Sequence, residues 1–251
     1  MVTRNSAWPA GTPCWVDLGA EVAKAVSFYS ELFGWEAQVG GPETGGYAQA
    51  RFGGLAVAGI GPLMDSSQPS AWTTYLASDG IEADVAKIRA AGGQVIMDAM
   101  DVMEFGRMAI AIDPTGAGFG LWQSGTHTGF ELANEPASVC WNEHMSADIE
   151  AGKRFYAEVF GYHFQDVAPE YVTFSLTEGG DAIGGMGVTG EGQAAWHTYF
   201  TVDDADATVA KVRELGGTVT AAAEDTDFGR MAGVTDDQGA GFKVIEVPAA
   251  S

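Results

Sequence analysis

The sequence has few basic residues and a large excess of acidic ones. Of its 251 residues only 12 are Lys or Arg, against 34 Asp or Glu, so the formal net charge is -22 at pH 7. Such a chain repels phosphate backbones and anionic lipid surfaces, so we expect neither nucleic acid nor a membrane among its partners. An acidic surface maintains solubility, and it also attracts cationic ligands. Charge alone leaves both interpretations open.

Export signals, long apolar runs and a disulfide framework are also missing. The first residues contain no apolar segment after their single Arg, and no stretch approaches the roughly 18 apolar residues of a membrane-spanning helix. The two cysteines, Cys14 and Cys140, each precede a Trp at matching places of a repeated pattern, which indicates strand positions and not a disulfide. We therefore expect a cytoplasmic protein in a reducing compartment.

Motifs of several large enzyme classes are absent as well. The chain contains no P-loop, no dinucleotide fingerprint after a first strand, no CxxC and no GxSxG. Its glycine-rich stretches, 45–54 and 178–187, lack the spacing of a phosphate cradle. Turn chemistry explains them adequately.

What the chain does contain is an internal repeat. FYSELFGW at 28–35 returns as FYAEVFGY at 155–162, Trp72-Thr73-Thr74-Tyr75 returns as Trp196-His197-Thr198-Tyr199, and Phe105–Ala109 returns as Phe228–Ala232. Because the offset drifts by only a few residues, the copies share one fold with short loop insertions. We predict a tail over 1–10, a first module over 11–124, a polar, turn-forming linker over 125–135 and a second module over 136–248.

Hydrophobic periodicity places the elements within each module. A strand that carries Cys-Trp comes first, and apolar residues at helical spacing then run from Val22 to Phe33, where Gly34 ends the helix. A meander of short strands follows, then a strand from Trp72, a second helix that ends before Gly92, and three final strands. Each module therefore reads as two βαβββ units, which is an α+β fold.

These features resemble a known superfamily. An FY pair, an FG that closes the first helix and the strand entry DP-x-G-A-x-F-G-L-W at 113–122 are similar to the vicinal oxygen chelate superfamily, which includes glyoxalases, bleomycin-resistance proteins and extradiol dioxygenases. The resemblance covers nearly the whole chain and is strongest to tandem-module, glyoxalase-like bacterial proteins without an assigned reaction. It implies cupped mixed sheets with helices outside and a pocket on each concave face. Tandem modules complete internally what single-module relatives achieve by dimerising, so we expect a monomer, with a homodimer as the alternative.

The resemblance also implies positions for a divalent metal, and this chain fills them poorly. Relatives place a His or Glu on the first strand, a His or Glu on the fifth and a Glu near the last. The corresponding residues here are Trp15, Thr73 and Gly120 in the first module, and Trp141, His197 and Lys243 in the second. Neither module has an intact set, so we expect no cofactor. The alternative is a divalent metal held by His197, Glu143 and a third ligand.

His197 and Glu143 are the candidate catalytic residues. Strand alternation puts His197 on one face with Tyr199, and Glu143 lies two residues after Trp141, so all four side chains share the predicted concave face. A carboxylate beside an imidazole can orient it as a general base. A lone strand histidine is nevertheless more often a hydrogen-bonded lining residue.

Aromatic, polar and basic residues complete the candidate ligand sites. Aromatic walls stack on flat ligands, and Tyr hydroxyls fix their orientation. Two arginines recur in the Phe-Gly-Arg-Met-Ala segments, where each either pairs with a nearby acid or offers donors to a carbonyl or carboxylate ligand. The predicted ligand-binding residues are Trp15, Asp17, Thr73, Tyr75, Arg107, Trp141, Tyr199 and Arg230.

Two functions remain open at this point. The first is a metal-independent protein that binds a planar, aromatic natural product or drug in an aromatic pocket, for sequestration, resistance or an accessory role in biosynthesis. The second is an enzyme, either a tailoring catalyst or a metal-dependent lyase, isomerase or dioxygenase, that uses His197 and Glu143. Trp at both first-strand metal positions favours the first function. The presence of His197 and Glu143 in only one module favours the second.

Overall fold

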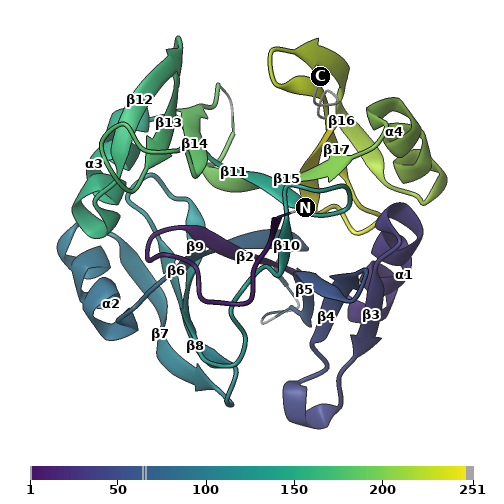
Figure 1. Cartoon of the computed structure of the whole chain (residues 1–251), viewed down its shortest axis with the longest axis horizontal. Coiled ribbons are helices and arrows are strands. Elements are labelled where there is room, and N and C mark those ends of the chain that lie inside the picture. Colours follow the sequence, from purple (N-terminus) through teal and green to yellow (C-terminus); the bar gives the residue numbers. More distant parts are fainter. Residues whose placement is uncertain (1, 64, 66, 191, 247–251) are drawn as a thin grey trace.

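The computed structural model describes residues 2–63, 65, 67–190 and 192–246, and it contains two large sheets of the same design (Figure 1). Module 1 contains β2 (Pro13–Ala20), α1 (Val22–Phe33), β3 (Glu36–Val39), the 3-10 turn η1 (Pro42–Thr44), β4 (Ala48–Phe52), β5 (Leu55–Pro62), β6 (Ala71–Ala77), α2 (Ile81–Ala90), β7 (Gln94–Val102), β8 (Gly106–Ile112) and β9 (Gly118–Ser124). Module 2 contains β11 (Val139–Ser146), α3 (Ile149–Phe160), β12 (His163–Ala168), β13 (Tyr171–Ser175), β14 (Gly184–Val188), β15 (Ala195–Val202), α4 (Ala205–Glu214), β16 (Thr218–Thr226), β17 (Gly229–Thr235) and β18 (Gly241–Glu246).

The strand order is the same in both modules. It runs β3-β4-β5-β2-β6-β9-β8-β7 in module 1 and β12-β13-β14-β11-β15-β18-β17-β16 in module 2. In each sheet the two central strands pair antiparallel, and each also pairs in parallel with its other neighbour. Each sheet is therefore two βαβββ halves joined at the centre, which confirms the predicted α+β fold of tandem modules.

The first helix of each module ends where the sequence predicts. Gly34 follows α1 with φ of 71°, and Gly161 follows α3 with φ of 72°, both in the left-handed region where glycine has no steric penalty. At the other ends, Glu21 caps α1 and Asp148 caps α3 through their side-chain oxygens. These caps fix the point at which the chain turns back into the sheet.

The two modules pack as one body and do not have separate cores. Helix α1 lies beside α4, and α2 lies beside α3 (Figure 1). The two hydrophobic clusters each contain residues of both modules. Matching hydrogen bonds cross the boundary, since the Tyr29 hydroxyl donates to Asp236 at 3.1 Å and the Tyr156 hydroxyl donates to Asp113 at 2.9 Å. We therefore expect a single cooperative unfolding transition.

The segment between the modules is more ordered than its polar composition suggests. Strand β10 (Leu132–Ala133) pairs antiparallel with β1 (Val2–Thr3), so the predicted tail and linker form a small sheet of their own. Phe130, just before β10, is 2% exposed. This segment therefore covers part of module 1. No helix in the described part of the chain is long and apolar enough to cross a membrane.

Candidate functional site

The face of each sheet that turns away from the helices forms a cup. In module 2 this face, here cup 2, carries Trp141, Glu143, Tyr171, His197, Tyr199 and Lys243. Register brings them together, because Glu143 lies opposite His197 and Trp141 lies opposite Tyr199 across the central strand pair. The predicted shared face is confirmed. The corresponding face of module 1, here cup 1, carries Trp15, Asp17, Tyr47, Thr73 and Tyr75.

A charged network lies at the centre of cup 2. The Glu143 side chain is 7% exposed, and each of its oxygens accepts from the Tyr199 hydroxyl at 3.0 Å. The Lys243 ammonium donates to Glu143 Oε1 at 3.0 Å and to the Tyr199 oxygen at 2.7 Å. Burial and the negative charge of Glu143 raise the pKa of Tyr199 well above its ordinary value. Tyr199 therefore stays a neutral phenol, and the carboxylate is compensated by the ammonium.

His197 lies at the edge of this network. Its Nδ1 is 4.0 Å from Glu143 Oε1, too far for a hydrogen bond, and this buried nitrogen has no partner among the residues described. The side chain as a whole is 40% exposed. Burial and the Lys243 ammonium lower the pKa of His197 below its ordinary value, so the imidazole is neutral at pH 7. It can accept a hydrogen bond or a proton from a molecule in the cup.

Trp141 and Tyr171 form the aromatic wall of cup 2. The Trp141 indole N–H donates to the Tyr171 oxygen at 3.1 Å. Gly185 makes this arrangement possible, since a Cβ there would lie 1.9 Å from the Tyr171 oxygen. Our prediction omitted Tyr171, although Tyr47 and Tyr171 occupy matching places of the repeat and could have indicated a shared role.

Cup 1 has the same design as cup 2, but the linker covers it. The Trp15 indole donates to Tyr47 at 3.0 Å, as Trp141 does to Tyr171, but Trp15 is only 2% exposed. The His127 ring lies edge-on against Trp15 at 4.4 Å, and Phe130 packs beside it at 5.5 Å. Burial lowers the pKa of His127 to about 4, so it packs as a neutral ring.

Asp17 is the counterpart of Glu143, but it has no lysine beside it. The position that matches Lys243 is Gly120, and the Tyr75 ring lies so close that a Cβ there would be 2.2 Å from it. Burial raises the pKa of Asp17 to about 7, although a hydrogen bond from Tyr75 opposes the rise. Thr73 pairs with Asp17 across the strands, at the place where cup 2 has His197. Cup 1 thus favours a protonated Asp17 below about pH 7, whereas cup 2 compensates its carboxylate with an ammonium.

The structure places the two arginines away from both cups. Arg107 contacts Glu82 on α2 and donates to Asp101 at 2.8 Å. Arg230 donates to Asp206 on α4 at 2.7 Å and to Asp225 at 3.0 Å. Both therefore lie on the helix-covered side of their sheets, which favours the ion-pair interpretation over ligand binding.

The remaining histidines lie outside the cups. His144 is fully buried between the modules, where its Nε2 lies 2.8 Å from Asp113 Oδ2, as expected for a residue on the face opposite Glu143. His163 is exposed on β12. These two residues have structural or surface positions, and neither adds to the chemistry of cup 2.

Cup 2 does not suit a divalent metal. No group of three or more His, Cys, Asp or Glu side chains that could hold an ion occurs in the described ranges. His197 and Glu143 supply one nitrogen and one carboxylate, but the third side chain is Lys243, whose ammonium is already bonded to that carboxylate. An ammonium has no lone pair to donate, so the residues present do not fit a metal.

Comparisons with known families cover both modules. The family described as "Glyoxalase/Bleomycin resistance protein/Dioxygenase superfamily" matches residues 19–121, and the family described as "Glyoxalase-like domain" matches residues 138–245. The two matches correspond to the two sheets. The gap between them contains the linker that closes cup 1.

Two relatives match nearly end to end. "Anthracycline biosynthesis protein DnrV" of Streptomyces peucetius is 39% identical over 257 residues, with 94% of each chain covered. "Putative glyoxylase CFP32" of Mycobacterium bovis is 39% identical over 258 residues, with 97% of each chain covered. One name refers to anthracycline biosynthesis and the other to a "Putative glyoxylase", so these matches alone do not select a reaction.

Solved structures share the fold at low identity. The Mn(II)-bound glyoxalase from Novosphingobium aromaticivorans superposes with a TM-score of 0.65 at 15% identity, covering 96% of this chain and 86% of that one. The halotolerant catechol dioxygenase BphC superposes with a TM-score of 0.64 at 16% identity, covering 96% and 89%. At this identity the likeness supports the fold alone.

Proposed function

The chain belongs to the glyoxalase, bleomycin resistance protein and dioxygenase superfamily, and we propose that cup 2 binds a planar aromatic natural product or drug without a metal ion. The observation that carries the proposal is the difference between the cups. Trp15 is buried beneath the linker, whereas Trp141 is partly exposed and His197 is 40% exposed beside a fixed charged network. An accessible aromatic wall beside oriented polar groups is the usual form of a small-molecule site.

The chemistry of cup 2 suits a flat ligand that carries phenol or quinone oxygens. Trp141 and Tyr171 offer an aromatic surface for stacking. Lys243 can donate to a ligand oxygen, and His197, whose side chain is 40% exposed, can accept from a phenol. One relative is named for the biosynthesis of anthracyclines, a class of fused-ring molecules with such oxygens. An accessory or protective role in the handling of such compounds fits these groups.

The hydroxyanthraquinone alizarin provides a direct test of this proposal. We expect saturable quenching of tryptophan fluorescence with a dissociation constant in the micromolar range, unchanged by EDTA. His197→Ala removes one hydrogen-bond partner and should weaken binding about tenfold, which corresponds to about 1.4 kcal/mol. The matched control is Thr73→Ala in closed cup 1, which should leave the affinity unchanged. Equal weakening by both variants, or loss of binding in EDTA, would contradict the proposal.

A second candidate function is metal-free acid–base catalysis in the same cup. It is favoured by the neutral state of His197 and by the 40% exposure of its side chain beside Glu143. We expect the protein to accelerate deuterium exchange next to the ketone of 2-indanone in D2O, followed by proton NMR. His197→Gln, which cannot act as a base, should lose at least about 100-fold of that acceleration. No acceleration by the wild-type protein, or full activity of the variant, would leave binding as the function.

A further inference from the structure

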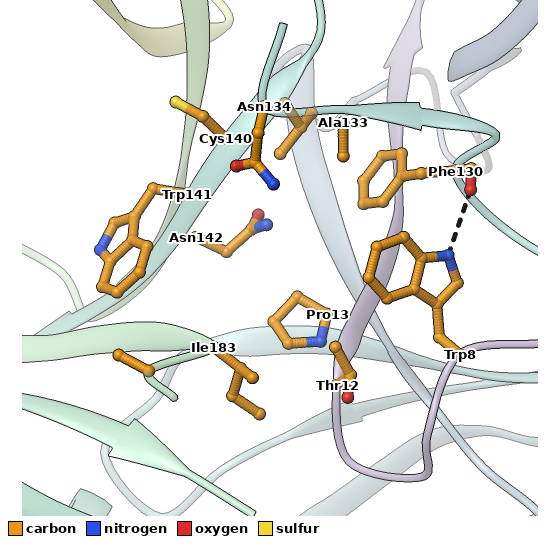
Figure 2. A pocket seen from close by; sticks show the side chains of 12 residues that line it. Trp8, Thr12, Pro13, Phe130, Ala133, Asn134, Cys140, Trp141, Asn142 and Ile183 are labelled. Carbon is orange, nitrogen blue, oxygen red and sulfur yellow. Dashed lines mark hydrogen bonds between the residues drawn. The ribbon is translucent and has the colours of Figure 1, made fainter. Parts of the chain in front are cut away.

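A cavity, here called the junction cavity, lies outside both cups, where the N-terminal segment, the linker and module 2 meet (Figure 2). Its volume is about 290 Å³, at the low end for pockets that hold small organic molecules. It borders cup 2 only through Trp141, and the described residues that line it include none with a charged side chain. In a chain with a net charge of -22 this is notable, because an uncharged lining selects an uncharged ligand.

Aromatic walls stand at two ends of this junction cavity. Trp8 and Trp141 lie on opposite sides of it (Figure 2). The Trp8 indole donates to the Phe130 carbonyl at 3.2 Å, and the Trp141 indole donates to Tyr171. Because both indole N–H groups are already satisfied elsewhere, the two rings offer apolar surfaces to the cavity.

Asn142 supplies an amide donor without a partner. The residue is 3% exposed, and its Oδ1 accepts from the Thr74 hydroxyl at 2.9 Å and from the Thr198 hydroxyl at 3.4 Å. These two bonds fix the amide, and its nitrogen then finds no acceptor within the described part of the chain. Figure 2 shows this side chain directed toward the middle of the cavity, with the Asn134 amide facing it. The amide N–H is therefore available to a molecule in the cavity.

Thr12 also lines the cavity but does not offer its hydroxyl to it. The residue is 6% exposed, and its hydroxyl oxygen is buried, so a molecule in the cavity does not reach it. The polar part of the site is therefore the Asn142 amide donor between the two aromatic walls.

We propose that the junction cavity is a binding site for a small, uncharged aromatic carbonyl compound, whose carbonyl oxygen accepts from the Asn142 amide while its ring lies between Trp8 and Trp141. The ligand is smaller than the one proposed for cup 2, and the site uses none of the Lys243, Glu143 and His197 side chains. Because the two sites share Trp141, variants of His197 and Ile183, which each belong to one site alone, distinguish the two proposals.

Titration with 1-tetralone, monitored by calorimetry, tests the site, with tetralin as the same ring frame lacking the carbonyl. We expect 1-tetralone to bind at least tenfold more tightly than tetralin. Asn142→Asp keeps the oxygen that Thr74 and Thr198 bond but removes the amide donor, so it should cancel that preference. If tetralin binds wild-type protein equally well, or if 1-tetralone does not bind at millimolar concentration, the proposal is wrong.

Two further variants locate the bound probe. Ile183 lines the cavity and is partly exposed, so Ile183→Trp should fill the space without unfolding the protein and should abolish 1-tetralone binding. If Asn142→Asp is unstable, Ile183→Trp alone tests whether 1-tetralone binds in the junction cavity. His197→Ala should leave 1-tetralone affinity unchanged. If His197→Ala abolishes binding and Ile183→Trp does not, the probe lies in cup 2 and the junction site is refuted.

Discussion

Lys243→Met should lower the free energy of unfolding by about 2 kcal/mol, although the lysine side chain is 32% exposed. The cost arises because Glu143, only 7% exposed, loses the cation that compensates its charge and keeps neutral hydroxyl partners, Tyr199 and Tyr171. Removing one partner of a fully buried pair costs about 3–5 kcal/mol, and we reduce this value because water reaches the lysine. Urea unfolding measures the change.

A double-mutant cycle separates the interaction energy of Lys243 and Glu143 from the other effects of each substitution on stability. Glu143→Gln leaves a lysine that can reach solvent, so it should cost less than Lys243→Met. The double variant should be more stable than the sum of the single losses predicts, by about 1 kcal/mol or more. Lys24→Met, which removes an exposed pair with Glu21, is the control and should change stability by less than about 0.5 kcal/mol. A Lys243→Met loss no larger than that of the control would show that Glu143 is not held by this ammonium.

Strand alternation made part of cup 2 predictable from the sequence. Because side chains two apart share a face, Trp141 could be grouped with Glu143 and His197 with Tyr199, and the repeat placed both pairs on corresponding strands. The glycines that end α1 and α3 were equally predictable, because glycine is the residue that adopts the left-handed conformation after a helix most easily. Features that depend only on residues close together in the chain can be predicted from the sequence.

Contacts that depend on register or on chain path could not be predicted this way. Counting along the last strand placed Lys243 at the last of the three metal positions, but nothing in the count paired it with Glu143, which lies on a strand that is not its neighbour. The polar composition around His127 suggested a solvated linker, yet the path of the chain lays that ring against Trp15. Asn142 lies on the face opposite Glu143, where alternation alone predicts ordinary core packing.

Asp17→Asn should stabilise the protein at pH 8 by about 2–4 kcal/mol and should have almost no effect at pH 4. Burial raises the pKa of Asp17 to about 7 in the folded protein, whereas the unfolded chain titrates near the ordinary value of about 3.9. The folded state therefore holds a proton that the unfolded state loses between these values. The contribution of Asp17 to the stability of the wild-type protein falls as pH rises from about 4 to about 7 and is then level. Each pKa unit of difference is worth about 1.4 kcal/mol, which gives the upper limit.

The same change at an exposed site provides the control for this pH dependence. Asp79→Asn, on the surface between β6 and α2, should give the same stability difference from wild type at both pH values. Urea unfolding of the three proteins from pH 4 to pH 8 measures the slopes. A flat difference between Asp17→Asn and wild type would mean that Asp17 is charged in the folded state at pH 8 without penalty. Cup 1 would then have to supply a compensating donor beyond the Tyr75 hydroxyl, and its closure would be looser than the buried Trp15 indicates.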